Sequence, residues 1–190
     1  MGYPISGKPP VASDLYGWVD YIQPFSSARG RGTSEPTWTD MGNGHFAYQF
    51  TVGEELFVPE HIRHNYKKGT KAYPHVHFCS DQTMSAGDQI TWRYGYVKAK
   101  GHSQGESMTV PETSFDMTYT ATGNEIAGEH IILECTEAQA FDLLEPDTYL
   151  SGRFELIGTN TAGRIFAQFG DLHVETDRDG TPGKAPDFYS

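Results

Sequence analysis

The sequence lacks the long apolar stretches that would place the chain in a membrane or direct it to secretion. No segment approaches the roughly 20 consecutive apolar residues that a membrane-spanning helix needs. The first residues, Met1 to Pro4, also lack the basic and apolar regions of a secretory signal. We therefore expect a soluble protein that is made in the cytoplasm.

Cysteine is scarce, with only 2 residues, Cys79 and Cys135. Two cysteines cannot form the disulfide framework of a small secreted protein. Both lie in apolar, strand-like runs, where cysteine behaves as a small buried hydrophobic residue. The sequence therefore predicts two buried free thiols in a reducing compartment.

Basic residues are also few, because 14 Lys and Arg stand against 25 Asp and Glu, which gives a formal net charge of −11 at pH 7. A surface this acidic repels the phosphates of nucleic acids and the headgroups of anionic membranes. The composition therefore argues against nucleic acid and against a membrane as partners.

What the sequence does contain is typical of a β protein. It has 21 Gly, 11 Pro, 11 Tyr, 11 Phe and 3 Trp, and no long run of helix-forming residues. Alternation is strictest from Gln89 to Val97, where Ile90, Trp92, Tyr94 and Tyr96 share one face and are expected in the core. About eight such segments predict an all-β fold, an antiparallel β-sandwich or jelly roll, and leave its strand order open.

Two compositional zones divide the chain. Residues 1–40 alternate Pro, Gly and Ser with isolated aromatics, which is too aromatic for a disordered tail and too broken for helix or sheet. We interpret them as an extended N-terminal arm that lies over its own domain or over a neighbouring subunit. Residues 41–190 are then a single β-sandwich domain. Within it, Thr136 to Leu144 is the one predicted helix, ended by Pro146.

The most informative stretch is the strand-like Pro74-His75-Val76-His77-Phe78. Side chains at i and i+2 of a strand point the same way, so His75 and His77 share a face. Paired imidazoles offer two nitrogens to a metal ion. They equally form a polar stripe that is hydrogen-bonded to other strands or to a partner subunit, and this structural interpretation carries the greater weight. A divalent metal at His75 and His77 is thus allowed by the sequence but not required by it.

A third ligand can be sought by resemblance to the cupins, whose first signature joins a Gly, a His-x-His and a nearby Glu. Gly69, His75, His77 and Asp81 resemble that signature, with the shorter Asp in place of Glu. His173 resembles the histidine of the second cupin signature, although the expected Pro is absent. The resemblance implies Asp81 and His173 as further ligands and makes a cupin-like metalloenzyme the alternative function.

Other catalytic schemes find less support. No Gly-x-Gly-x-x-Gly unit and no Gly-Lys-Ser/Thr phosphate loop occurs in the sequence. The carboxylates Glu54, Glu55 and Glu112 fall in turns or loops and are expected to be solvated. We assign no catalytic residue, require no cofactor and expect a protein that is not an enzyme.

A broader resemblance covers about half of the chain, at residues 48–100 and 150–180. Tailed-bacteriophage genomes often encode virion-associated proteins of about this length that carry the same elements in the same order. The elements are Glu55-Leu56-Phe57, Lys68-Gly69-Thr70, Pro74-His75-Val76-His77-Phe78, Trp92-Arg93-Tyr94-Gly95-Tyr96 and Asp171-Leu172-His173-Val174-Glu175-Thr176-Asp177. The chain is thus similar to a phage family with a Pro-His-x-His strand.

This resemblance implies a structural protein of the phage particle. The expected role is a capsid decoration or cement protein that binds the major capsid protein or other virion proteins and stabilises the shell through many contacts. A minor protein attached to the head or tail is the alternative. Virion jelly rolls commonly assemble as trimers, so we expect a homotrimer whose arm is exchanged between neighbours. An acidic subunit would also suit a basic shell.

Overall fold

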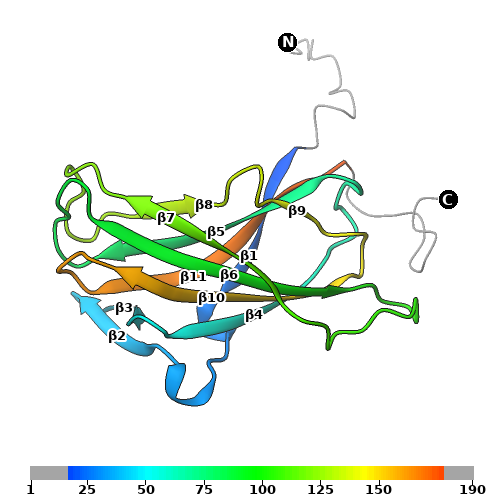
Figure 1. Ribbon diagram of the computed structural model, residues 1–190, viewed down its shortest axis with the longest axis horizontal. Helices are drawn as coiled ribbons and strands as arrows, with labels where there is room; N and C mark the ends of the chain where they lie inside the picture. Colours follow the sequence, from blue (N-terminus) through cyan, green and yellow to red (C-terminus); the bar gives the residue numbers. More distant parts are fainter. Residues whose placement is uncertain (1–16, 178–190) are drawn as a thin grey trace, which may run out of the picture.

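The computed structural model describes residues 17–177 and confirms the predicted fold class. Two antiparallel β-sheets pack face to face as a sandwich (Figure 1). Helical structure in this part of the chain is confined to two three-residue 3-10 turns, η2 (Phe25–Ser27) and η3 (Gly32–Ser34). No helix within the described range has the length and apolar character needed to cross a bilayer.

The larger sheet has seven strands and the smaller sheet has four. The path through the larger sheet runs β2 (Thr37–Gly42), β3 (His45–Phe50), β11 (Ile165–Glu175), β5 (Lys71–Ser80), β8 (Ile131–Glu134). Beside this path, β1 (Trp18–Pro24) pairs with β11 and β9 (Phe141–Asp142) pairs with β5. The smaller sheet runs β4 (Glu55–His61), β10 (Tyr149–Thr159), β6 (Gln89–Ala99), β7 (Thr113–Thr120).

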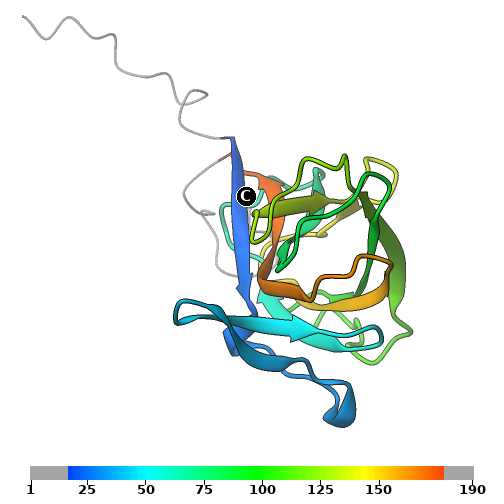
Figure 2. The same cartoon turned by 90° about the vertical axis from the view of Figure 1, so that its left-hand side faces the viewer.

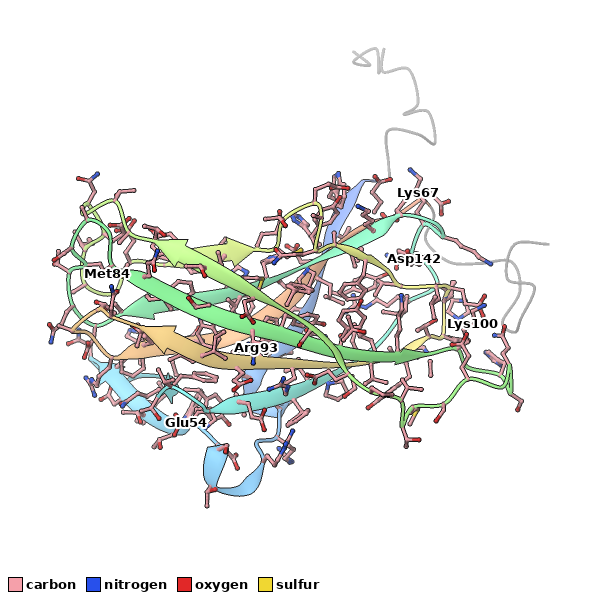
Figure 3. The ribbon with its side chains drawn as sticks, in the orientation of Figure 1. Glu54, Lys67, Met84, Arg93, Lys100 and Asp142 are labelled. Carbon is pink, nitrogen blue, oxygen red and sulfur yellow. The ribbon has the colours of Figure 1, made fainter. Side chains whose placement is uncertain are left out.

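The strand order is that of a jelly roll. One sheet contains β3-β11-β5-β8 and the other contains β4-β10-β6-β7, so that strands adjacent in sequence repeatedly change sheets as in a double Greek key. Met84, between β5 and β6, and Lys100, just after β6, lie at opposite ends of the sandwich (Figure 3). The loops that connect the two sheets therefore bring together, at each end of the sandwich, residues that are distant in the sequence.

Aromatic side chains fill the space between the sheets, as the alternation in β6 predicts. Trp92 and Tyr94 are completely buried, and Tyr96 lies at the edge of the same core, where its ring stacks on Phe141 at a centroid distance of 3.8 Å. The predicted buried thiols are also confirmed. Gly170 is required by this packing, because a Cβ atom there would lie 2.3 Å from the Phe154 ring.

The expected arm over residues 1–40 is wrong for the part that the structure describes; residues 1–16 lie outside it. Trp18–Pro24 forms β1 and pairs along its whole length with β11 of the same chain. Tyr21 and Phe25 are fully buried in the core. The boundary expected at residue 40 falls inside β2. Alternation of inward Tyr21 with outward Ile22 is a strand signal that the surrounding Pro and Gly residues obscured.

The predicted helix from Thr136 to Leu144 is also wrong. The chain makes a single turn, in which Ala140 N–H donates to the Thr136 carbonyl at 3.0 Å, and then enters β9. Phe141 and Leu143 are buried while Asp142 between them is exposed, which is the period of a strand. Pairing with β5 across this short segment replaces the helix because it buries the apolar side chains against the existing core.

Replacing Tyr21 tests whether β1 is an integral strand. Tyr21→Ala removes a fully buried ring and its hydrogen bond of 2.6 Å to Asn65, so we expect the free energy of unfolding to fall by about 3 kcal/mol. Ile22→Ala is the matched control, because Ile22 is 52% exposed and its loss should cost less than about 1 kcal/mol. Urea unfolding of both variants measures the difference. Equal small losses would show that β1 is a detachable arm.

Candidate functional site: a histidine cluster on the larger sheet

The two histidines of the Pro-His-x-His strand lie on the outer face of the larger sheet. β5 pairs with β11 in antiparallel register, and His75 stands directly opposite Asp171. Because side chains alternate along each strand, His75 and His77 share the outer face of β5, and Asp171 and His173 share that of β11. We call this group the histidine cluster, which comprises Asp20, His75, His77, His130, Glu134, Asp171 and His173.

Asp171 is the centre of the cluster. His75 Nε2 lies 2.5 Å from Asp171 Oδ1, and His77 Nε2 lies 3.4 Å from Asp171 Oδ2. His75 is 4% exposed and Asp171 only 1%, although both belong to the outer face. Asp171 Oδ1 and His77 Nε2 are buried without a hydrogen-bond partner of good geometry among residues 17–177. Two imidazole nitrogens and a carboxylate therefore meet in a nearly dry site.

The second nitrogen of each ring faces a different neighbour. His75 Nδ1 lies 3.3 Å from the carbonyl oxygen of Tyr73, and His77 Nδ1 lies 2.7 Å from His130 Nε2. The ring of Phe169 stacks on His77 at a centroid distance of 4.1 Å. These contacts fix the orientation of both imidazoles and leave their Nε2 atoms directed at Asp171.

His173 belongs to the outer part of the cluster. Its Nδ1 lies 2.9 Å from Glu134 on β8, and its Nε2 lies 3.3 Å from Asp20 on β1. Glu134 is also 3.8 Å from His75 Nδ1. The cluster thus crosses four strands as alternating carboxylates and imidazoles, and each outer member is about half exposed.

The electrostatics of the inner part favour a positive charge beside Asp171. Burial disfavours the charged form of both His75 and Asp171. Contact with the Asp171 carboxylate nevertheless raises the pKa of His75 above its ordinary value. In turn, contacts with His75 and His77 hold the pKa of Asp171 below its ordinary value. Both shifts favour a protonated His75 beside an ionised Asp171.

Of the four ligands considered from sequence, the structure brings His75, His77 and His173 to one face. Asp81 is not with them, so its expected place in the ligand set is wrong. It follows the end of β5 and forms an ion pair of 2.6 Å with Arg164. Asp171 was not expected in this group because its place opposite His75 depends on the pairing of two strands almost 100 residues apart. The alternation of Asp171 with His173 was the only local signal.

A pocket of about 210 Å³ adjoins the cluster on one side. His77, His130 and Phe169 line it together with Cys79 and Phe166. Neither His75 nor Asp171 reaches it. The pocket therefore meets the cluster only at the stacked rings of His77 and His130.

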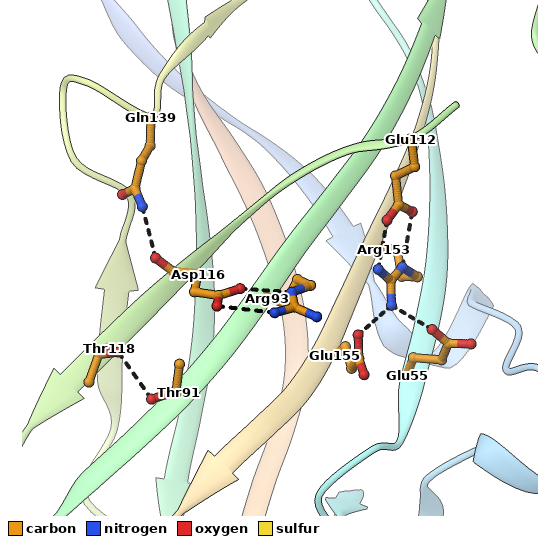
Figure 4. A network of polar contacts seen from close by, with 9 residues as sticks. All are labelled: Glu55, Thr91, Arg93, Glu112, Asp116, Thr118, Gln139, Arg153 and Glu155. Atoms are coloured by element: carbon orange, nitrogen blue, oxygen red, sulfur yellow. Dashed lines mark hydrogen bonds and ion pairs between the residues drawn. The ribbon is translucent and has the colours of Figure 1, made fainter. Parts of the chain in front are cut away.

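A second polar network lies on the smaller sheet and was not expected from sequence. Arg153 on β10 is 9% exposed and is surrounded by three carboxylates (Figure 4). It lies 2.6 Å from Glu112, 2.7 Å from Glu55 and 2.5 Å from Glu155. Hydrogen bonding to Glu112, above all, raises the pKa of Arg153. Glu55 is buried rather than solvated, and Glu112 is tied to this arginine, which corrects the expectation for both.

Three further histidines surround a single carboxylate near the end of β4. Asp147 Oδ1 lies 2.9 Å from His61 Nε2 and 3.0 Å from His64 Nε2, and Asp147 Oδ2 lies 2.6 Å from His102 Nε2. Partial burial opposes ionisation, but hydrogen bonds from His102 and His64 lower the pKa of Asp147. This group ties the β6–β7 connection to the loops that follow β4 and precede β10.

A Gly-x-Ser-x-Gly pattern also occurs, at residues 101–105, and was not singled out from the sequence. In hydrolases this pattern places a nucleophilic serine on a sharp turn between a strand and a helix. Here Ser103 has a positive φ of 59°, but it is exposed in the connection from β6 to β7, and no helix follows. The pattern therefore lacks the structural context of a nucleophile.

Comparison with known proteins adds no family assignment. No protein-family model and no curated protein matches the chain. We therefore infer the function from the geometry described above and from the order of motifs in the sequence.

Removing Arg153 tests the network on the smaller sheet. Arg153→Ala leaves the buried Glu55 with only the largely exposed Arg31, 3.1 Å away, as a counter-charge, so we expect the free energy of unfolding to fall by about 3 kcal/mol. Arg93→Ala is the matched control: Arg93 pairs with Asp116 on the same sheet at 2.7 Å, but in a half-exposed position, and its loss should cost less than about 1 kcal/mol. Urea unfolding at pH 7 measures both. Equal costs would contradict the buried role of Arg153.

Proposed function

We propose that this protein is a structural component of a tailed-bacteriophage particle, specifically a decoration or cement protein that binds the capsid shell. The proposal is supported by the ordered set of motifs and by the jelly-roll arrangement of strands. Four of the five motif segments lie on β4, β5, β6 and β11, and the fifth, Lys68-Gly69-Thr70, directly precedes β5. The resemblance therefore falls on the framework of the fold, and the function is sought on its surfaces.

The observation that carries the proposal is an exposed aromatic hairpin at the edge of the larger sheet. β2 and β3 form this hairpin, which extends beyond the body of the sandwich (Figure 2). Trp38 and Phe46 are 49% and 46% exposed, and their rings stack at a centroid distance of 6.1 Å. β2 is the last strand on its side of the sheet. An edge strand with exposed aromatics is suited to contact another protein.

A second exposed apolar strip follows β1 on the outer face of the same sheet. Trp18 and Ile22 are each 52% exposed, and they lie on the side of β1 opposite to the buried Tyr21. Contiguous apolar patches on the surface of a soluble protein commonly mark a contact with a partner. Neighbouring copies in a homotrimer and the shell itself are the partners that we propose for these surfaces.

Charge and number of copies complete the proposed mechanism. The net charge of −11 favours binding to a basic shell. Added salt screens this attraction and is expected to weaken the binding. Many copies on a symmetric lattice would each contribute a modest contact, and their sum would stabilise the shell. In this function the protein is found in the virion, binds the major capsid protein and performs no turnover.

Mass spectrometry of purified particles tests the proposal. We expect the chain in the particles, with a copy number comparable to that of the major capsid protein. A copy number that is a small fraction of the capsid protein would instead indicate the minor head- or tail-attached protein. Complete absence from the particles would overturn the virion role.

The contribution of the hairpin can be measured separately, by co-sedimentation of purified protein with particles that lack it. Replacing Trp38 and Phe46 together by Ser should reduce the bound fraction at least tenfold, because it removes the exposed aromatic surface while leaving the core intact. Ile126→Ser is the control, since Ile126 is 67% exposed and belongs to the β7–β8 connection, outside the hairpin. Undiminished binding of the double variant would exclude the hairpin as the contact.

A further inference from the structure

We propose that His75, His77 and Asp171 form a site for one divalent transition-metal ion, with Zn²⁺ as the best-fitting ion. This inference concerns a binding site within one subunit and is independent of the proposed role in the virion. It depends on three observations: the placement of the donor atoms, the unsatisfied polar atoms among them, and the direction in which each imidazole donates its proton.

The donor atoms are close enough to share one ion. One nitrogen of each histidine and a carboxylate oxygen of Asp171 all lie within 4.8 Å of one another. Zinc binds histidine nitrogen and carboxylate oxygen at about 2.0–2.2 Å, which separates tetrahedral donors by roughly 3.3 Å. The separation of 3.4 Å between His77 Nε2 and Asp171 Oδ2 already meets this requirement. The shorter contact of His75, at 2.5 Å, needs to open by less than about 1 Å.

The unsatisfied atoms are the independent evidence for a ligand. Asp171 is 1% exposed, and its Oδ1, although 2.5 Å from His75 Nε2, has no well-aligned hydrogen-bond donor among the described residues. His77 Nε2 is a second buried atom that lacks a well-aligned hydrogen-bond partner among the described residues. Leaving such atoms unpaired destabilises a fold, by about 1–3 kcal/mol for a neutral group and more for a charged one. A single cation between them would satisfy both.

The outer nitrogens determine the tautomers that this cation would meet. The carbonyl of Tyr73 can only accept a hydrogen bond, so His75 donates from Nδ1. His77 can donate in the same way from Nδ1 to His130. Both Nε2 atoms then present lone pairs to the carboxylate, an arrangement that is repulsive unless a cation lies between them. Metal-binding histidines characteristically donate their second N–H to a carbonyl or similar acceptor.

The chemistry of the donors selects the class of ion. Two imidazoles and one carboxylate suit Zn²⁺, Co²⁺ or Fe²⁺, whereas Mg²⁺ and Ca²⁺ prefer sites made of oxygen atoms. Three protein donors leave at least one position for water or another ligand. The ion would join β5 to β11 at the middle of the larger sheet. Because His75 and Asp171 are almost fully buried within one chain, no neighbouring subunit is needed to complete the site.

A second group, formed by His75, Glu134 and His173, also has donor atoms within 4.8 Å of one another. It is the less suitable site, because Glu134 is exposed, His173 is only partly buried, and the two are already hydrogen-bonded to each other at 2.9 Å. His75 belongs to both groups, but its inner nitrogen serves one and its outer nitrogen the other. Variants at Asp171 and His173 therefore distinguish the two sites.

Isothermal titration of the full chain with Zn²⁺, after removal of metals with a chelator, tests the proposal. We expect one equivalent of Zn²⁺ to bind and the melting temperature to rise by several degrees, with no such effect of Mg²⁺. Asp171→Asn and His77→Ala should each weaken Zn²⁺ binding at least tenfold. His173→Ala, the matched control in the neighbouring position of β11, should change it less than twofold.

Circular dichroism and the melting temperature of the metal-free proteins establish whether each variant is folded. If Asp171→Asn does not fold, His77→Ala provides the test instead. The Co²⁺ complex gives a second readout, because its visible spectrum reports nitrogen and oxygen ligands and should be lost in both site variants. Absence of Zn²⁺ binding by the folded wild-type chain would overturn the proposal. The positive charge beside Asp171 would then be supplied by a proton. Loss of binding in His173→Ala with retention in Asp171→Asn would also overturn it. None of these results would test whether the chain is present in virions, which mass spectrometry of the particles decides separately.

Discussion

The pairing of β5 with β11 is the constraint on which the rest of the structure depends. One face of this strand pair supplies Val76 and Leu172 to the core, and the other face carries His75 opposite Asp171. Because side chains alternate with a period of two, a slip by one residue would put the carboxylate into the core and an apolar side chain outside. The hydrophobic core and the histidine cluster are therefore fixed by the same register.

The same pair is flanked on both sides by strands that complete the sheet. β1 and β3 both pair with the edge of β11 that faces away from β5, and β8 and β9 both pair with the edge of β5 that faces away from β11. This arrangement explains why His75 and Asp171 are buried although they face outward: neighbouring side chains from β1, β8 and the loop of His130 surround them. The site is thus a product of sheet assembly and does not require a cleft.

Local sequence patterns predicted the features that depend on one strand alone. The all-β fold, the buried Trp92 and Tyr94, and the shared face of His75 and His77 follow from alternation. Features that depend on pairing were not predicted: Asp171 as a partner of His75, the burial of Glu55 beside Arg153, and the place of β1 in the sheet. The predicted helix failed for a related reason, since an apolar spacing that suits one helical turn also suits a short strand when β5 offers an open edge.

The joining of β1 to β11 has a consequence for how the chain reaches this structure. Thr176 N–H donates to the carbonyl of Gly17 at 2.8 Å, and these residues are 159 positions apart. A ribosome adding about 5–20 residues per second needs roughly 10–30 seconds between them. During that interval β1 lacks its partner strand, and the ring of Tyr21, which is buried in the folded protein, stays exposed to solvent. Folding of this sandwich is therefore largely post-translational, and the nascent chain is most vulnerable to self-association just before its final strand emerges.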